Sequence, residues 1–158
     1  MSRTWPRCPI LTGRAWALGL GVTAELILPR AHRGAADTKQ FLMTPIDPDF
    51  PRRVAPGDIV VGGDDFAAGT EDDTGVRAML AAGIAATVAY SFDPQFARFA
   101  LERGLPAVEV NESLAIHTGE RLRVDLESSR VVNMSSGDRY PIRNVDDAFL
   151  ERFRPTDA

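Results

Sequence analysis

The segment PGDIVVGGDDFAAGTEDDTGVRAMLAAGIAATVAY, residues 56–90, decides the fold. A proline–glycine turn leads into a short β-branched run at residues 58–61, which is typical of a buried strand. Helical composition follows at residues 76–82 and stops at Gly83, and residues 84–90 form a second apolar, β-branched run. A strand, a helix and a strand in this order predict two parallel strands joined by a right-handed crossover.

The same alternation extends to both sides of this segment. Residues 94–103 have the composition of a helix that ends at Gly104, and residues 107–110 form a third short apolar run. Toward the N-terminus, residues 13–19 are typical of a buried strand that enters a glycine-rich turn. The sequence therefore predicts an α/β fold with a mostly parallel central sheet.

The C-terminal part of the chain has a different pattern. Residues 121–126 alternate strictly between polar and apolar, and residues 130–134 and 139–142 follow after polar turns. This pattern predicts an antiparallel meander, followed by a terminal helix at residues 146–153. We expect one domain, residues 1–158, that carries the meander as a small β appendage.

The composition of the 158-residue chain excludes several classes of protein. An apolar fraction of 44% and a charged fraction of 25% are ordinary for a soluble globular domain. The net charge of −4 is mild, and the absence of a basic stripe with interleaved aromatics argues against nucleic-acid binding. The apolar stretch at residues 15–28 is interrupted by Glu25 and is too short to span a bilayer. We expect a cytoplasmic protein without a membrane partner.

Cysteine and histidine are too few for a metal centre in this chain. Cys8 is the single cysteine, so neither an intrachain disulfide nor a cysteine-ligated cluster can form. The two histidines, His32 and His117, are far apart and lack metal-ligand spacing. If the protein uses iron–sulfur chemistry, the cluster must sit on another chain.

Short motifs along nearly the whole chain, residues 13–154, together resemble the aconitase swivel-domain family, most of all the small subunits of 3-isopropylmalate dehydratase. The motifs are GRAW at 13–16, ILP at 27–29, FLM at 41–43, DPDF at 47–50, PGDIVVGG at 56–63, AGI at 82–84, SF at 91–92, GLP at 104–106, TG at 118–119 and VDL at 124–126. No one motif is specific, but their order and spacing together are. The resemblance implies a swivelling β/β/α domain.

The resemblance also implies a division of labour between two subunits in a cytoplasmic hydro-lyase of leucine biosynthesis. A large partner subunit carries a [4Fe-4S] cluster, whose open iron acts as a Lewis acid on the hydroxyl of a hydroxy-acid substrate. The small subunit closes over that site and contributes an alkoxide-type base and groups that bind the substrate carboxylates. In the family these groups lie on a Gly-Ser-Ser-Arg-Glu-His loop and on an aspartate-rich turn near the N-terminus.

This sequence departs from the family at both of these places. The loop is GTEDDT at residues 69–74, so Thr70 keeps a hydroxyl where the family has its first serine, while Glu71 and Asp72 replace the second serine and the arginine. The family's Asp-Thr-Asp turn is Thr-Ala-Glu at residues 23–25, with one extra position before the ILP motif. The residues predicted for the site are Thr70 as the catalytic residue, and Gly69, Glu71, Asp72, Thr23, Glu25 and Arg77 for substrate binding.

The acids at residues 71–73 are expected on the first turn of the helix that follows the loop. The N-terminus of a helix attracts anions, and these acids would compete for its positive potential and repel a dicarboxylate. One like-charge contact near 4 Å costs about 4 kcal/mol at an effective dielectric constant of 20. That cost exceeds the roughly 1 kcal/mol that a helix end provides. The sequence therefore argues against ordinary isopropylmalate or citrate chemistry and predicts a shifted specificity.

Other interpretations of the same residues stay open. Thr70 and Asp73 match a capping box, in which case the loop is structural. The acids at residues 64–65 and 71–73 are oxygen ligands of the kind that Mg²⁺ or Ca²⁺ prefers, although their spacing fits no calcium loop. Arg14, Arg77 and Arg98 are alternatives for holding a carboxylate.

A different class of function is also compatible with the altered loop. The chain could be a non-catalytic swivel-like module for binding or regulation that keeps the fold without the substrate chemistry. Restoration of the family residues at positions 70–72 would then create carboxylate binding that the parent lacks.

Overall fold

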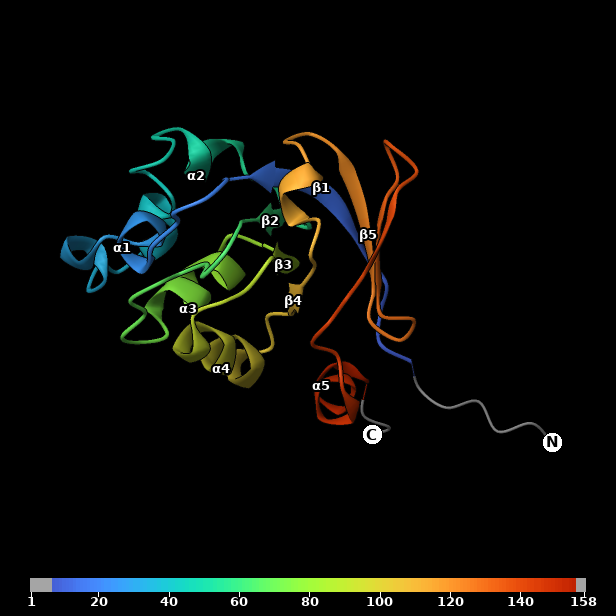
Figure 1. The fold of residues 1–158 in the computed structure, drawn as a ribbon. Helices are drawn as coiled ribbons and strands as arrows, with labels where there is room; N and C mark the ends of the chain where they lie inside the picture. Colours follow the sequence, from blue (N-terminus) through green and yellow to red (C-terminus); the bar gives the residue numbers. More distant parts are fainter. Residues whose placement is uncertain (1–6, 156–158) are drawn as a thin grey trace.

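The computed structural model describes residues 7–155, which form a seven-stranded mixed sheet in the order β4-β3-β2-β1-β5-β6-β7 (Figure 1). The strands are β1 (Leu11–Ala17), β2 (Ile59–Val61), β3 (Ala86–Ala89), β4 (Ala107–Glu109), β5 (Arg121–Asp125), β6 (Arg130–Asn133) and β7 (Arg139–Pro141). Strands β1 to β4 pair in parallel, and β5 to β7 continue from β1 in antiparallel pairs. The predicted α/β class with a mostly parallel sheet and a C-terminal meander is confirmed.

The C-terminal meander continues the central sheet, because β1 belongs to both the parallel and the antiparallel part. Residues 11–14 of β1 pair with β5, and residues 15–17 pair with β2. Gly13 stands at this crossing, where an added Cβ would lie 1.9 Å from the carbonyl oxygen of Gly57. A side chain at this position would therefore prevent the turn before β2 from packing against β1.

Five helices and three 3₁₀ turns connect the strands. They are α1 (Ala24–Ile27), η1 (Arg30–His32), η2 (Thr38–Phe41), α2 (Phe50–Arg53), α3 (Thr74–Ala81), α4 (Pro94–Arg103), η3 (Ser113–Ala115) and α5 (Asp147–Phe153). The predicted bounds of α4 are confirmed, because the Asp93 carboxylate caps its N-terminus and Gly104 ends it at φ +87°. Helix α3 begins two residues earlier than predicted, a difference that matters for the site.

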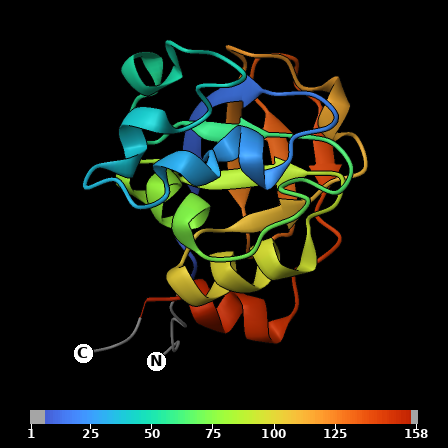
Figure 2. The ribbon, with the colours of Figure 1, turned by 90° about the vertical axis from the view of Figure 1, so that its left-hand side faces the viewer.

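The sheet separates two apolar cores, and alternate residues of its strands contribute to each core. Trp16 and Val60 pack on the side of α3 and α4, which lie in front of the parallel strands in Figure 2. Ala15 and Ile59 face the other side, toward the meander and Phe149 of α5. Because β1 to β4 run parallel, the loops that follow them meet at one edge of the sheet. None of the helices within residues 7–155 is long and apolar enough to cross a membrane.

Candidate functional site

The loop at residues 62–73, which follows β2, is joined by backbone hydrogen bonds to the segment after β1. The Ala67 amide donates to the Val22 carbonyl at 2.8 Å, and the Ala24 amide donates to the Ala68 carbonyl at 2.9 Å. Both bonds lie close to the N-terminus of α1. The two sequence regions in which the chain departs from the family that it resembles are therefore in direct contact.

The same loop is held from its other side by the segment after β3. The Phe66 amide donates to the Ser91 carbonyl and the Asp93 amide donates to the Phe66 carbonyl, both at 2.9 Å. The Phe66 ring is buried and packs edge-on against Phe96 of α4, with 5.6 Å between the ring centroids. Gly69 adds a hydrogen bond from its amide to the Asp93 carboxylate at 3.2 Å. The first part of the loop is thus held by the segments that follow β1 and β3.

Thr70 lies at the end of this fixed part of the loop. Its hydroxyl donates to the Ala67 carbonyl at 2.6 Å, and its side chain is half-buried. Thr70 lines a hollow with Arg33, Glu71, Asp72 and apolar side chains of α1 and α3. The hollow has a volume of about 10 Å³, enough for roughly one water molecule. The predicted catalytic threonine therefore lines a hollow, but neighbouring side chains leave little free space in it.

The predicted capping box of Thr70 and Asp73 is wrong. Helix α3 begins at Thr74, and the side chain of its N-cap residue, Asp73, makes no capping hydrogen bond. The Asp72 carboxylate takes that place, because it accepts from the Thr74 amide at 3.0 Å and from the Thr74 hydroxyl. The Asp73 carboxylate instead pairs with Arg103 of α4. Tertiary contact with α4 has overridden the local capping pattern.

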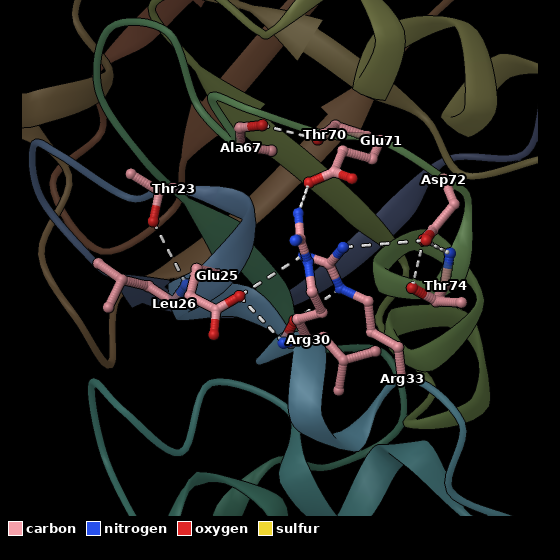
Figure 3. A network of polar contacts seen from close by, with 11 residues as sticks. Thr23, Glu25, Leu26, Arg30, Arg33, Ala67, Thr70, Glu71, Asp72 and Thr74 are labelled. Atoms are coloured by element: carbon pink, nitrogen blue, oxygen red, sulfur yellow. Dashed lines mark hydrogen bonds and ion pairs between the residues drawn. The ribbon is translucent and has the colours of Figure 1, made fainter.

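The expectation of uncompensated negative charge on the first turn of α3 is also wrong. The acids precede the helix, and arginines of η1 and the residue after it neutralise them (Figure 3). Arg30 pairs with Glu71. Arg33 lies between two acids, with Nη1 at 3.8 Å from Asp72 and Nη2 at 3.7 Å from Glu25. The like-charge repulsion expected from the sequence is therefore largely offset by two guanidinium groups.

Hydrogen bonding keeps Asp72 in its charged form. The bond from the Thr74 hydroxyl is the main cause that lowers the pKa of Asp72, and burial opposes it. The Thr74 amide, Arg33 and Arg30 lower the pKa of Asp72 further. Asp72 is therefore an anion at neutral pH and remains available as a partner for Arg33.

Arg30 and Arg33 are the site residues that the sequence reasoning missed. They are three residues apart, directly after the ILP motif, and face a loop about 40 positions further along the chain. The sequence did contain a signal, two closely spaced arginines and, further along the chain, a loop rich in acids. Sequence alone does not show that the two segments meet, so the acids were expected to interact with the N-terminus of the next helix.

No protein-family model matches the chain. A 3-isopropylmalate dehydratase small subunit of Nautilia profundicola is 33% identical over 90% of this chain and 87% of its own length. An isopropylmalate/citramalate isomerase small subunit of Methanocaldococcus jannaschii is 37% identical, with the same shares covered. The chain belongs to the 3-isopropylmalate dehydratase small-subunit family.

The structural match agrees with this assignment to the small-subunit family. A crystal structure of 3-isopropylmalate dehydratase from Methanocaldococcus jannaschii superposes with a TM-score of 0.81 at 29% identity. The match covers 85% of this chain and 82% of that chain. The swivel-type architecture expected from the resemblance is therefore confirmed.

The other residues predicted for this family's site lie around the hollow or away from it. The Thr23 hydroxyl oxygen accepts from the Leu26 amide at 3.3 Å and caps α1, beside Glu25. Arg77 is exposed and lies 3.6 Å from Asp73, so it is outside the hollow that Thr70 lines. Two further arginines are engaged elsewhere, Arg14 with Asp58 and Arg98 with Phe99.

The chain does not gather the ligands of a metal site within the described part. Among residues 7–155, no three His, Cys, Asp or Glu side chains are grouped to hold a metal ion. Asp64, one of the acids considered for a cation, accepts a hydrogen bond from Ser91. Cys8 is buried, and its thiol donates to the Leu150 carbonyl at 3.4 Å. These residues do not fit an iron–sulfur cluster.

Proposed function

We propose that this chain is the small subunit of a two-subunit hydro-lyase that acts on a hydroxy dicarboxylic acid related to isopropylmalate. The observation that carries the proposal is the position of Thr70, which stands where the family has its first serine and lines a hollow beside the loop that follows β2. Family membership supports the class of reaction. The proposed partner is a large subunit whose [4Fe-4S] cluster supplies a Lewis acid for the departing hydroxyl.

Thr70 is proposed to handle the proton of the reaction. In dehydration a carbon next to a carboxylate loses a proton to a base, the neighbouring carbon loses hydroxide, which becomes water with a proton from solvent, and a double bond is formed. The Thr70 oxygen would accept that proton as an alkoxide and return it in hydration. Arg33, which lines the same hollow, favours the alkoxide, whereas Glu71 and Asp72 oppose it. The pairing of these acids with the arginines removes most of the electrostatic objection to this role.

The substrate is proposed to be smaller than, or differently charged from, the usual substrate of the family. A relative that is 37% identical bears the name isopropylmalate/citramalate isomerase, so related small subunits act on more than one hydroxy acid. In this chain Glu71 and Asp72 extend into the hollow where the family has serine and arginine. Citramalate and isopropylmalate are therefore the first compounds to test.

The test is reconstitution with a large subunit of 3-isopropylmalate dehydratase. The two chains are co-expressed, purified without oxygen and supplied with iron and sulfide, and the double bond of the unsaturated acid is followed by ultraviolet absorbance. We expect turnover of at least one of the two hydroxy acids only when both chains are present. Absence of turnover of any hydroxy dicarboxylate by a cluster-loaded complex would end the proposal.

A second candidate function is the non-catalytic swivel module. It is favoured by one observation, that Arg33 already has acidic partners on both sides and the hollow is almost filled. The loop variant with Thr70→Ser, Glu71→Ser and Asp72→Arg would then have to be combined with Arg33→Ala, because Asp72→Arg alone places two arginines together. Carboxylate binding that is gained by this variant, in a complex that never turns over substrate, would favour the module.

A further inference from the structure

Arg30 and Arg33 present two guanidinium groups to the same acidic loop. They flank the single turn of η1 and converge on the consecutive residues Glu71 and Asp72 (Figure 3). Two carboxylates that are joined by a short covalent link and face two arginines resemble a small dicarboxylate in its binding site. The arrangement therefore has the form of an occupied site whose occupant is the chain itself.

The Arg33 guanidinium makes few of the hydrogen bonds that it could donate. Its side chain is only 13% exposed. Within residues 7–155 its one hydrogen bond runs from Nε to the Leu28 carbonyl, at 3.2 Å. The two Nη atoms lie 3.7 and 3.8 Å from Glu25 and Asp72, beyond the roughly 2.7–2.9 Å of a charge-assisted hydrogen bond. A free carboxylate that enters the hollow can bind Arg33 in a bidentate way that these acids do not achieve.

The acids that occupy the arginines are easily displaced. The side chains of Glu71, Asp72 and Glu25 are 57%, 48% and 61% exposed. Ion pairs of exposed side chains contribute little to stability, because water and salt screen them. Loss of the ion pairs between these acids and the arginines therefore costs little compared with the bidentate contacts that a ligand would form, and Oδ1 of Asp72 can keep its hydrogen bonds to Thr74.

We propose that Arg30 and Arg33 form a binding site for a small dicarboxylate, and that Glu71 and Asp72 are built-in competitors that occupy it until the ligand arrives. Binding breaks the ion pairs of both acids with the arginines and turns the Glu71 side chain into solvent, which enlarges the hollow beside Thr70, while Asp72 keeps its hydrogen bonds to Thr74. The choice of a hydroxy dicarboxylate as ligand rests on the proposed function, because the Thr70 hydroxyl lines the same hollow. The binding itself does not require the large subunit.

The experiment is calorimetric titration of the full-length chain with malate and citramalate, with acetate as the monocarboxylate reference. The double variant Glu71→Gln, Asp72→Asn should bind both dicarboxylates about tenfold more tightly than the parent, because the competitors are gone. Arg33→Gln and Arg30→Gln should each weaken binding by about tenfold or more. Acetate should bind weakly to all of them, because it engages one arginine at a time.

The matched controls come from the ion pair between Asp49, the residue before α2, and Arg52 of α2, which lies outside the hollow. Asp49→Asn and Arg52→Gln should bind the dicarboxylates as the parent does, and thermal melts would confirm that every variant is folded. A double variant that binds no more tightly than the parent overturns the proposal. So does undiminished binding by both Arg30→Gln and Arg33→Gln. Loss of hydro-lyase activity with this binding pattern intact would count against the proposed function alone.

Discussion

Two of the arginine–carboxylate clusters within residues 7–155 have similar composition and different geometry. Arg154 grips Glu127 in a bidentate way, with distances of 2.9 Å from Nε and 3.0 Å from Nη2 to the two carboxylate oxygens. Glu127 also accepts from the Cys8 amide at 2.9 Å, so this cluster joins both ends of the described chain. Arg33, by contrast, reaches its two acids only at 3.7 and 3.8 Å.

This difference teaches that geometry, more than the number of charges, separates a structural ion pair from an exchangeable one. The hydrogen bond from Arg154 is the main cause that lowers the pKa of Glu127 to about 2, with the Cys8 amide as the second cause. Such a carboxylate is held by strong, charge-assisted hydrogen bonds, and a ligand would not readily displace it. The acids around Arg33 are exposed and make no close hydrogen bond to it, as expected where a ligand has to replace them.

The largest expected effect is on catalysis at the Arg33 cluster. Thr70→Ala should lower the turnover of the reconstituted complex by about 100-fold or more, because the proton loses its acceptor. Thr70→Ser, which keeps the hydroxyl, should retain most of the activity. Full activity of Thr70→Ala, measured in the same ultraviolet assay, would show that this region is not the reacting one.

The next effect is on stability at the Arg154 cluster. Glu127→Gln removes the charge that holds both Arg154 and the Cys8 amide, and we expect Tm to fall by roughly 4 °C. Activity of the complex at 25 °C should be unchanged, because this cluster is outside the hollow. Differential scanning calorimetry checks the shift, and a Tm equal to that of the parent would remove the contrast between the two clusters.

The pH dependence of stability should separate the clusters as well. The pKa of Glu127 lies below its ordinary value of 4.5 in the folded chain, at about 2, so the stabilisation is complete above pH 4.5 and is lost as the pH falls toward 2. The difference in the free energy of unfolding between the parent and Glu127→Gln should therefore narrow over this range. Urea titrations at pH 6 and at pH 3 would measure it, and a constant difference would contradict the assignment.

The smallest expected effect is on stability at the Arg33 cluster. Asp72→Asn removes an exposed ion pair and keeps a side-chain oxygen that can accept from Thr74, so Tm should change by less than about 2 °C. The same melt applied to Glu127→Gln provides the reference. A fall in Tm as large as in that variant would mean that the acids near Arg33 are structural and not competitors for a ligand.

Local patterns were sufficient for most of the fold. Helix α4 was predicted with the bounds that it has, because Asp93 and Gly104 cap it with residues adjacent in sequence. The strands were placed by their apolar runs, although β3 is shorter than residues 84–90 suggested. The dual pairing of β1 was not predictable from its own composition, because the choice of its two neighbours depends on segments far along the chain.

Some features of the candidate site were likewise predictable from local sequence and others were not. Thr70 and the acids that follow it were identified from the sequence, and the hollow does bring Thr70, Glu71 and Asp72 together. The capping box of Thr70 and Asp73 does not form because Asp73 has a partner on α4, a contact that no local pattern encodes. The opposing charges of Arg30 and Arg33 were missed for the same reason.

The sequence by itself determined the order of strands and helices, the family, and the substitution of acids into its substrate loop. Only the tertiary structure decided what those acids do, since Arg30 and Glu71 are separated by 41 positions and meet through the contact between α1 and the loop after β2. Residue type and spacing govern local conformation, whereas the electrostatic environment of a side chain depends on whichever distant segments the fold places around it.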